Sequence, residues 1–576
     1  MSAQRDENLE LIRRDGAFDV VVVGGGINGI GVFRELALQN LRVLLVERND
    51  FCSGCSAAPS RMIHGGLRYL ENGEFGLVRE SLRERDALLT NAPHMVRPLP
   101  TTIPIWSVFS GLLNGAAGFL GLSSKPSSRG ALPIKIGLSL YDWTTRKKRL
   151  LPKHSFRGAR ETLRRWPQLS PRLLFSATYY DAWISYPERL GVEMVIDTKR
   201  LAPESVALNY AQVERAGDGF VVVDGQSGDK IEVSTKVIVN ATGAWLDESL
   251  DSLAAGEKRN EPFVSGTKGS HLILDCPPLL EALGGHMIFF ENADGRVCIV
   301  FPYLGKVLAG STDIRVKAAA RVRCEPEEQD YILDALRRVF PGIGIAADQV
   351  VFSYSGIRPL PTSDQEFTGR ITRSHFIHRV DGVVPQFCMV GGKWTTFRAL
   401  AEQTADAVLA ELGCDRVRDT LALPIGGGDG FSDVVDEFEA ELVERYGIDP
   451  RRAAYLADAY GTRAEDVLRF CQQRDDDRPL DDTSRTTEAE IAFLAANEFA
   501  VSLEDVLLRR TPLSIRGDVS ADIVVRTAEA MAGELGWSDE RKEREIASFL
   551  RNLENYHGVP KDMLDRRSRE RSLTCA

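Results

Sequence analysis

The sequence predicts an α/β fold followed by a C-terminal α-helical domain, and three observations support this prediction. Residues 18–50 run through a β-branched apolar strand, a glycine-rich turn, a helical pattern and a second apolar strand, which is the pattern of a βαβ unit. Two later segments, 236–248 and 387–412, again pass from an apolar strand into a turn of small residues. From about residue 426 the chain changes to charged stretches with helical periodicity.

The first turn has the spacing of a dinucleotide-binding site. Gly24, Gly26 and Gly29 form a G-x-G-x-x-G pattern between strand and helix, and the second strand ends in Glu47, 21 residues after Gly26. The glycines allow a tight turn and a close approach of a pyrophosphate to the positive end of the helix, and the acid accepts hydrogen bonds from ribose hydroxyls. We therefore predict a Rossmann-like dinucleotide site. The alternative is a glycine-rich turn in an unrelated βαβ unit.

The motif by itself fits NAD and FAD equally. The second strand-to-turn segment carries Ala241, Thr242 and Gly243, and the third carries Gly391 and Gly392 before a long amphipathic helix. A second helix start that presents backbone N–H groups suits a flavin, whose N1 and C2 carbonyl gain negative charge on reduction. FAD is therefore the expected cofactor.

Length and composition narrow the class of protein. A chain of 576 residues is too long for one hydrophobic core, so two or three domains are expected. The formal net charge of -11 argues against nucleic acid as a partner, because such binding depends on neutralising phosphates. The nine cysteines are scattered and odd in number, as expected for reduced thiols. We interpret the C-x-x-C of Cys52 and Cys55 as coincidence rather than a metal or redox site.

One short stretch combines several chemical groups. His64, followed by two glycines, offers a proton-transfer group, Arg68 a fixed cation and Tyr69 a phenol within six positions. Histidine is the natural general base near neutral pH, and arginine suits a phosphate because its planar fork donates paired hydrogen bonds. His271 is a second candidate base. The alternatives are structural histidines and solvated or ion-paired arginines.

Seven motifs occur together, in the order GGGINGIG, IHGGLRYLENGEFGLVRESLRERDALLTNAPH, ATGAWLD, TKGSHLIL, GSTD, YSGIRPL and GGKWTTFRALAE. With this order and spacing, residues 15–405 resemble the FAD-dependent glycerol-3-phosphate dehydrogenases of the respiratory, membrane-associated type. The resemblance implies a Rossmann-like FAD-binding domain of the glutathione-reductase/D-amino-acid-oxidase type with an interleaved β-sheet substrate domain. The expected parts of the chain are FAD-binding at about 15–90, 171–260 and 350–405, substrate and membrane parts at about 91–170 and 261–349, and a C-terminal helical domain at 426–576. We interpret the glycine-rich residues 426–433 as the linker to that last domain.

The resemblance also assigns site residues by their motif positions. The expected catalytic residues are His64, His271 and Arg358, and the expected substrate-binding residues are Arg68, Tyr69, Arg358 and Lys393. The expected cofactor-binding residues are Gly24, Gly26, Asn28, Gly29, Glu47, Arg48, Ser60, His64, Ala241, Gly243, Gly392, Lys393 and Thr395. No metal is expected.

The chain departs from the family pattern at several points. Residues 57–59 (Ala-Ala-Pro) replace a run of serines and threonines, Trp394 replaces the commoner leucine, and the segment 181–190 lacks an expected acidic residue. These differences are consistent with a subfamily that has an altered substrate or electron acceptor.

The segment 104–122 is unusually apolar, and no charged residue lies between Arg97 and Lys125. Glycines, serines, Asn114 and prolines interrupt it, so it falls short of the about 20 strongly apolar residues of a spanning helix. We interpret it as a monotopic membrane anchor that dips into one leaflet. The alternative is a loop buried in a subunit interface.

The expected function is oxidation of sn-glycerol 3-phosphate to dihydroxyacetone phosphate, with the hydride passed to flavin N5 and the electrons to a quinone. The resemblance implies a homodimer in the cytoplasm, bound peripherally to the inner face of the cytoplasmic membrane. Two alternatives stay open. One is a glycerol-3-phosphate oxidase that passes electrons to O2 and produces H2O2, and the other is a flavin-binding regulatory protein without turnover.

Overall fold

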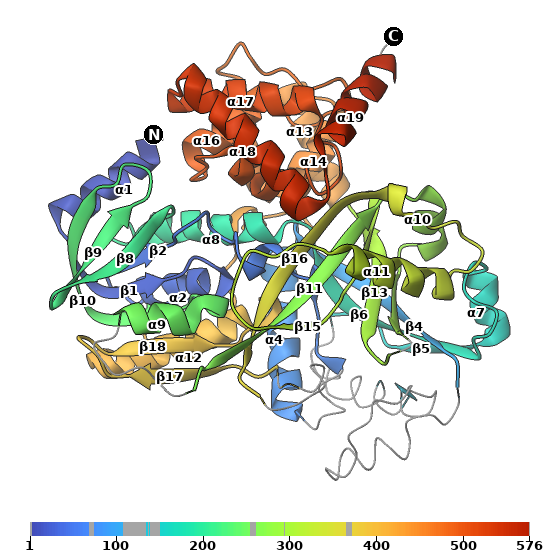
Figure 1. Ribbon diagram of the computed structural model, residues 1–576, viewed down its shortest axis with the longest axis horizontal. Coiled ribbons are helices and arrows are strands. Elements are labelled where there is room, and N and C mark those ends of the chain that lie inside the picture. The colour runs from blue at the N-terminus through green and yellow to red at the C-terminus, as the bar shows by residue number, and fades with distance from the viewer. Residues whose placement is uncertain are drawn as a thin grey trace.

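The computed structural model describes residues 3–67, 74–107, 134–135, 138, 150–253, 261–292, 294–363, 371 and 373–574. Figure 1 shows two sheet-based halves side by side, with the C-terminal helices packed across the top. The predicted order of an α/β region followed by a helical domain is confirmed.

The nucleotide half is built on a sheet with a parallel centre. Its strands are β1 (Ala17–Val23), β2 (Val43–Val46), β7 (Val206–Leu208), β8 (Ala211–Ala216), β9 (Gly219–Asp224), β10 (Lys230–Asn240), β17 (Phe376–Val380) and β18 (Gln386–Val390). The parallel order is β18-β10-β1-β2-β7, while β17 and the hairpin β8–β9 pair antiparallel at the margins. Strand β2 is buried throughout, as expected for an apolar strand that is covered on both faces.

Three helices pack together on this sheet: α2 (Ile27–Ala37), α8 (Pro187–Leu201) and α12 (Phe397–Leu412). Helix α2 contacts both of the others, and Gly31 allows α12 to come close. A Cβ atom at Gly31 would lie 2.9 Å from the Phe397 ring and 3.2 Å from the Ala401 methyl group. The close pairing places the starts of α2 and α12 next to each other, on the side of the sheet where β1 and β18 end.

The second half is a mainly antiparallel sheet. Its strands are β3 (Met62–Ile63), β4 (Val96–Ile105), β5 (Ser155–Gly158), β6 (Phe175–Ile184), β11 (Val264–Leu274), β12 (Met287–Glu291), β13 (Val297–Tyr303), β14 (Lys306–Gly310), β15 (Ile314–Val316) and β16 (Val350–Pro361). The predicted division of the chain differs here, because β6 and β16 fall in segments expected to belong to the FAD-binding part. The long pair β11–β16 sets His271 opposite Tyr354 and Thr267 opposite Arg358.

The remaining helices lie around the two sheets and in the C-terminal domain. Around the sheets they are α1 (Ala3–Arg14), α4 (Phe75–Asn91), α7 (Ala159–Arg165), α9 (Leu246–Leu253), α10 (Pro277–Leu283) and α11 (Pro326–Val339). The C-terminal domain contains α13 (Val435–Tyr446), α14 (Pro450–Tyr460), α15 (Ala464–Cys471), α16 (Glu488–Asn497), a π-helix (Asp505–Arg510), α17 (Ala521–Leu535), α18 (Asp539–His557) and α19 (Lys561–Thr574). Apolar side chains of this domain and of the nucleotide half form one continuous core.

The predicted linker, the glycine-rich residues 426–433, begins with a tightly packed stretch. Gly426 and Gly427 are buried. A Cβ atom added at Gly426 would lie 1.8 Å from the Glu193 carboxylate, and one added at Gly427 would lie 1.7 Å from the Tyr460 carbonyl oxygen. The glycines are needed because this stretch is pressed between α8 and the end of α14, which joins the C-terminal domain firmly to the nucleotide half.

Candidate active site

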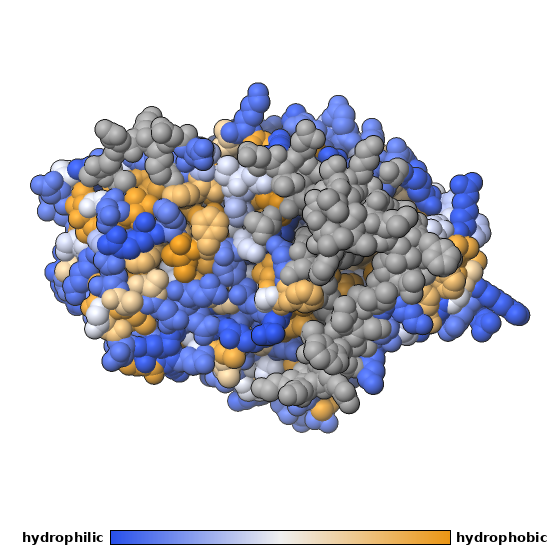
Figure 2. Space-filling view, turned by 90° about the horizontal axis from the view of Figure 1, so that it is seen from below, coloured by the Kyte–Doolittle hydropathy of each residue, from blue (hydrophilic) through white to orange (hydrophobic). Residues whose placement is uncertain are grey.

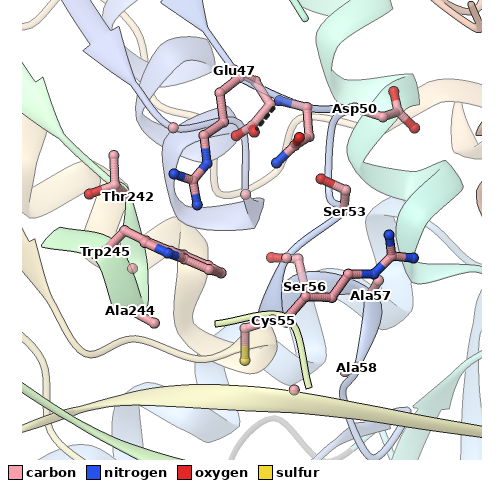
Figure 3. Close-up of a pocket in the computed structure, with 18 of the residues that line it drawn as sticks. Glu47, Asp50, Ser53, Cys55, Ser56, Ala57, Ala58, Thr242, Ala244 and Trp245 are labelled. Carbon is pink, nitrogen blue, oxygen red and sulfur yellow. Dashed lines mark hydrogen bonds between the residues drawn. The ribbon is translucent and has the colours of Figure 1, made fainter. Parts of the chain in front are cut away.

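A cavity of about 1090 Å³ lies between the two sheets and the C-terminal domain. Figure 3 shows Glu47 at one end, with Trp245 projecting in from one side and Ser53, Ser56 and Cys55 lining the other. Nine of the predicted cofactor-binding residues line this cavity. They are Gly24, Gly26, Asn28, Glu47, Arg48, Ala241, Gly243, Gly392 and Lys393.

The first glycine turn has the geometry of a phosphate cradle. Gly24 has φ +105, and a Cβ atom at Gly29 would lie 1.8 Å from the Gly24 carbonyl oxygen, so both positions require glycine for the turn itself. At Gly26 a Cβ atom would meet only the Ser56 hydroxyl, at 3.2 Å, so its surroundings leave space for a ligand. Helix α2 starts after Gly26 without a side-chain cap. Its first-turn N–H groups suit a pyrophosphate.

The far end of the cavity suits an adenosine. The half-buried Glu47 carboxylate accepts hydrogen bonds from the backbone N–H groups of Gly25 at 2.6 Å and Asn49 at 2.9 Å, which fixes its direction. Burial raises the pKa of Glu47. The Arg48 guanidinium lies 4.6 Å from the centre of the Trp245 ring, and both side chains line the cavity. Trp245 was not assigned to the site from the sequence, although it lies in the ATGAWLD motif.

The second glycine turn is held against the first. Asn28 at the start of α2 donates to the Gly391 carbonyl oxygen at 3.2 Å, and a Cβ atom at Gly392 would lie 2.4 Å from the Asn28 amide nitrogen. Gly392 has φ +95, in the region that favours glycine. Thr395 accepts a hydrogen bond from the His64 backbone N–H at 3.2 Å. The two helix starts therefore face the cavity together, as a flavin dinucleotide requires.

His271 is held in a buried and largely apolar position. Its Nε2 lies 2.9 Å from the Ser60 hydroxyl, and its ring is stacked on Tyr354 with centroids 4.9 Å apart. Burial lowers the pKa of His271 well below its usual value, and the nearby charges of Arg358 and Arg61 lower it further. The imidazole is therefore neutral at physiological pH, which is the form that accepts a proton.

Arg358 lies beside this imidazole on β16. Its guanidinium covers Gly269, where a Cβ atom would lie 2.0 Å away, and it donates to the Ser311 hydroxyl at 3.0 Å and toward Asp313 at 3.3 Å. Arg373 approaches the other oxygen of Asp313 at 3.7 Å. Arg373 was missed in the sequence because it follows the YSGIRPL motif by a stretch without a recognisable pattern.

Lys393 belongs to the same cationic group. Burial lowers the pKa of Lys393 to about 7; Glu80 and Glu74 oppose this shift and Arg373 adds to it. Arg373 also lowers the pKa of Arg358, after burial as the main cause. Arg358 thus lies near the neutral His271, and Arg373 connects Arg358 to Lys393 through electrostatic interactions with both. The other predicted substrate residues, Arg68 and Tyr69, lie outside the described residues.

A buried ion pair between Arg61 and Glu188 lines the cavity, and the sequence analysis did not assign either residue to the site. Arg61 donates to both oxygens of Glu188, at 2.8 and 2.7 Å. Two of the departures from the family pattern, Trp394 and the Ala57–Ala58 pair, are neighbours in the structure. The Trp394 indole donates to the Ser56 carbonyl oxygen at 3.0 Å and so stabilises the turn that carries Ala57 and Ala58. None of the eight cysteines within the described ranges forms a disulfide, and no group of His, Cys, Asp and Glu there is placed to hold a metal.

The residues fit a flavin dinucleotide, since a phosphate cradle, a ribose-binding carboxylate and a second helix start line one cavity. The fold and the cavity therefore define a flavoprotein oxidoreductase. Comparison with known proteins agrees: residues 19–407 match the FAD dependent oxidoreductase family, and residues 418–542 match the C-terminal domain of alpha-glycerophosphate oxidase.

Individual relatives extend over nearly the whole chain. A glycerol-3-phosphate dehydrogenase of Synechocystis is 32% identical over 562 residues, covering 93% of this chain and 96% of the relative. A D-erythritol 1-phosphate dehydrogenase of Brucella abortus is 31% identical, covering 86% and 94%. The solved glycerol-3-phosphate dehydrogenase of Bacillus halodurans, in complex with FAD, superposes with a TM-score of 0.75 at 24% identity, covering 96% and 98%. The chain belongs to the FAD-dependent glycerol-3-phosphate dehydrogenase family, and FAD is its cofactor.

The cradle geometry predicts that Gly26→Val folds but does not bind FAD. A side chain at Gly26 meets only a flexible hydroxyl within the protein, so the expected conflict is with the pyrophosphate. The measurement is the flavin absorbance of the purified protein together with its circular dichroism. Gly76→Val is the control, because a Cβ atom there has no neighbour within 4 Å. A fully flavin-loaded Gly26→Val protein would contradict the cradle assignment.

Proposed function

We propose that the protein oxidises sn-glycerol 3-phosphate to dihydroxyacetone phosphate. The observation that carries this proposal is a neutral, buried histidine, His271, beside Arg358, which is the first of a row of basic residues that continues to Arg373 and Lys393. A secondary alcohol phosphate needs a base for its hydroxyl proton and cations for its phosphate. The names of the relatives support the same substrate class.

The chemistry divides between cofactor and protein. Bound FAD supplies the hydride acceptor at N5. His271 takes the hydroxyl proton as the C–H bond loses its hydride, and Ser60 and Tyr354 hold the imidazole in place for this transfer. Arg358 and Lys393 bind the phosphate, and Asp313 holds Arg358 through a charge-assisted contact. His64 stays an alternative base.

The electron acceptor we propose is a quinone, and the rival is O2. The relatives named as dehydrogenases support a quinone, while the C-terminal match to alpha-glycerophosphate oxidase supports O2. Reoxidation of the reduced protein by a soluble quinone analogue or by O2, with H2O2 measured in parallel, decides between them. Stoichiometric H2O2 in place of quinol would overturn the quinone proposal.

Membrane attachment is the second part of the proposal. Residues 104–107 are described and the rest of the segment 104–122 is not. Trp106, Leu150 and Leu174 are large apolar side chains that are 37%, 59% and 42% exposed. Trp106 and Leu174 are adjacent, since the Leu174 N–H donates to the Ile105 carbonyl oxygen. Figure 2 shows the molecule from below, with apolar patches on the surface, some of them next to the residues drawn in grey. Within the described ranges no helix has the length and apolar character needed to cross a bilayer.

We propose that this face binds the inner surface of the cytoplasmic membrane, where quinone is dissolved. Burying such side chains in the headgroup region is favourable in proportion to the apolar area removed from water.

A homodimer is proposed from the family resemblance alone, and analytical ultracentrifugation of the detergent-released protein tests it. A monomer at micromolar concentration would overturn it.

An anaerobic titration is expected to show bleaching of the flavin by glycerol 3-phosphate and not by glycerol or glycine. Arg358→Ala should keep FAD but raise the substrate requirement roughly a hundredfold, because a charge-assisted phosphate contact contributes about 2–3 kcal/mol. Arg379→Ala, which removes an exposed arginine paired with Glu411 and Asp381, is the matched control. D-Erythritol 1-phosphate is the competing substrate, and preferential bleaching by it would reassign the substrate within the same class.

The pKa of Lys393, about 7, predicts a pH-dependent affinity for the substrate. The dianionic phosphate binds the ammonium form, and this form declines about tenfold per pH unit above the pKa. The substrate concentration for half-bleaching should therefore rise between pH 7 and 9, a range in which the phosphate stays a dianion because its second pKa is about 6. Lys393→Arg should flatten this profile, because arginine stays charged. A flat profile in the unmodified protein would remove Lys393 from the phosphate site.

Changing Trp106, Leu150 and Leu174 together to serine should release the protein from phospholipid vesicles. Each buried large apolar side chain contributes roughly 1.5–3 kcal/mol. The control changes Val417, Val434 and Val525 to serine; these valines are also exposed and lie elsewhere in the chain. Flavin reduction should survive in both variants, while turnover with membrane quinone should fall only in the first. Equal sedimentation of both variants with vesicles would exclude these residues from the membrane contact.

A further inference from the structure

The C-terminal domain forms one wall of the FAD cavity. Glu504, Leu508 and Arg509 from around its π-helix, and Tyr556 from the end of α18, line the same space as Gly24 and Glu47. No predicted cofactor-binding residue lies in this domain. The cofactor site is therefore built from parts of the chain that are up to about 500 residues apart, and the domain has a role in FAD binding that the sequence motifs do not reveal.

A surface segment of the other half reaches across to this wall. Residues 317–325 connect β15 to α11, and Ala320, Arg321 and Val322 at its centre line the cavity. The Arg321 guanidinium lies 4.2 Å from the centre of the Tyr556 ring and 3.2 Å from the Glu504 carboxylate. The segment thus spans from the substrate sheet to the C-terminal domain over the cavity.

Two other contacts of the C-terminal domain are buried and harder to break. Arg509 and Arg510 both donate to Asp50, and these three side chains are buried. His557 stacks on Phe352 with ring centroids 4.6 Å apart and lies 3.0 Å from the Ser353 carbonyl oxygen. Separating buried ion pairs is strongly unfavourable, whereas an exposed pair contributes little. Arg321 is 46% exposed, so its contacts open more easily than these buried ones.

We propose that Arg321 is a clasp: it fastens the segment 317–325 to Tyr556 and Glu504 and so retains FAD in its cavity. Opening of the clasp uncovers the cavity while the buried contacts of the C-terminal domain stay intact. The proposal rests on FAD binding and not on the identity of the substrate, so it stands or falls independently of glycerol 3-phosphate oxidation.

The test is the rate at which FAD leaves the full-length holoprotein, followed as the rise of flavin fluorescence after dilution into a large excess of a flavin-trapping apoprotein. Arg321→Ala should release FAD roughly three- to thirtyfold faster, the combined range of an exposed ion pair and a cation–π contact. Arg323→Ala is the matched control, because Arg323 lies two residues on and its hydrogen bonds and ion pair go to Glu325, while its interaction with Tyr556 is a minor electrostatic one. It should release FAD at the unmodified rate.

The double variant Arg321→Ala/Tyr556→Ala tests whether Arg321 and Tyr556 act together on FAD release or each affect the release rate independently. If Arg321 acts through Tyr556, the double variant should release FAD more slowly than the product of the two single effects predicts. The melting temperature of the apoproteins should be unchanged, which shows that the variants fold. An unchanged release rate in Arg321→Ala, or single effects that multiply in the double variant, would overturn the proposal.

Discussion

The arrangement of the domains depends on one buried interaction, the ion pairs of the Asp50 carboxylate with two arginines of the C-terminal domain. Asp50 follows Glu47 in the loop after β2 and accepts hydrogen bonds from Arg509 at 2.6 Å and from Arg510 at 2.7 and 2.8 Å. Burial by itself would raise the pKa of Asp50, but the two guanidiniums hold it below its usual value. Removing one member of such a cluster leaves an uncompensated buried charge, at a cost of about 3–5 kcal/mol. The loop that follows Glu47 is therefore fixed by the C-terminal domain.

Close backbone contact is the second constraint, and it acts at two places with different purposes. At Gly24 and Gly29 it shapes the turn that faces the pyrophosphate, and at Gly426 and Gly427 it presses the domain junction against α8 and α14. In both cases a side chain would collide with a neighbouring backbone or carboxylate group, so glycine is needed for its small size and not for chain flexibility. The sequence shows glycines in both stretches, but only the first has a spacing that identifies its purpose.

The parts of the fold and site that follow from the sequence are those encoded locally. The glycine turn, Glu47 and the second helix start at Gly392 each lie within one strand-turn-helix unit, so periodicity and spacing reveal them. Arg373, Arg321 and the pair of Arg61 with Glu188 depend instead on segments that meet only through sheet pairing and domain packing. No short-range pattern marks such residues, and the pairing of β6 and β16 within the second sheet likewise depends on segments that are distant in the sequence.

The electrostatics of the site couple the base to the substrate. In the protein alone, burial and the charges of Arg358 and Arg61 make His271 a weak base. A phosphate dianion bound by Arg358 and Lys393 would neutralise part of that positive field, and a nearby negative charge raises the pKa of an imidazole. The proposed substrate therefore strengthens the base that acts on it. Glycerol, which has the same hydroxyls and no phosphate, leaves the field unchanged, so poor reduction by glycerol follows from both weak binding and weak proton transfer.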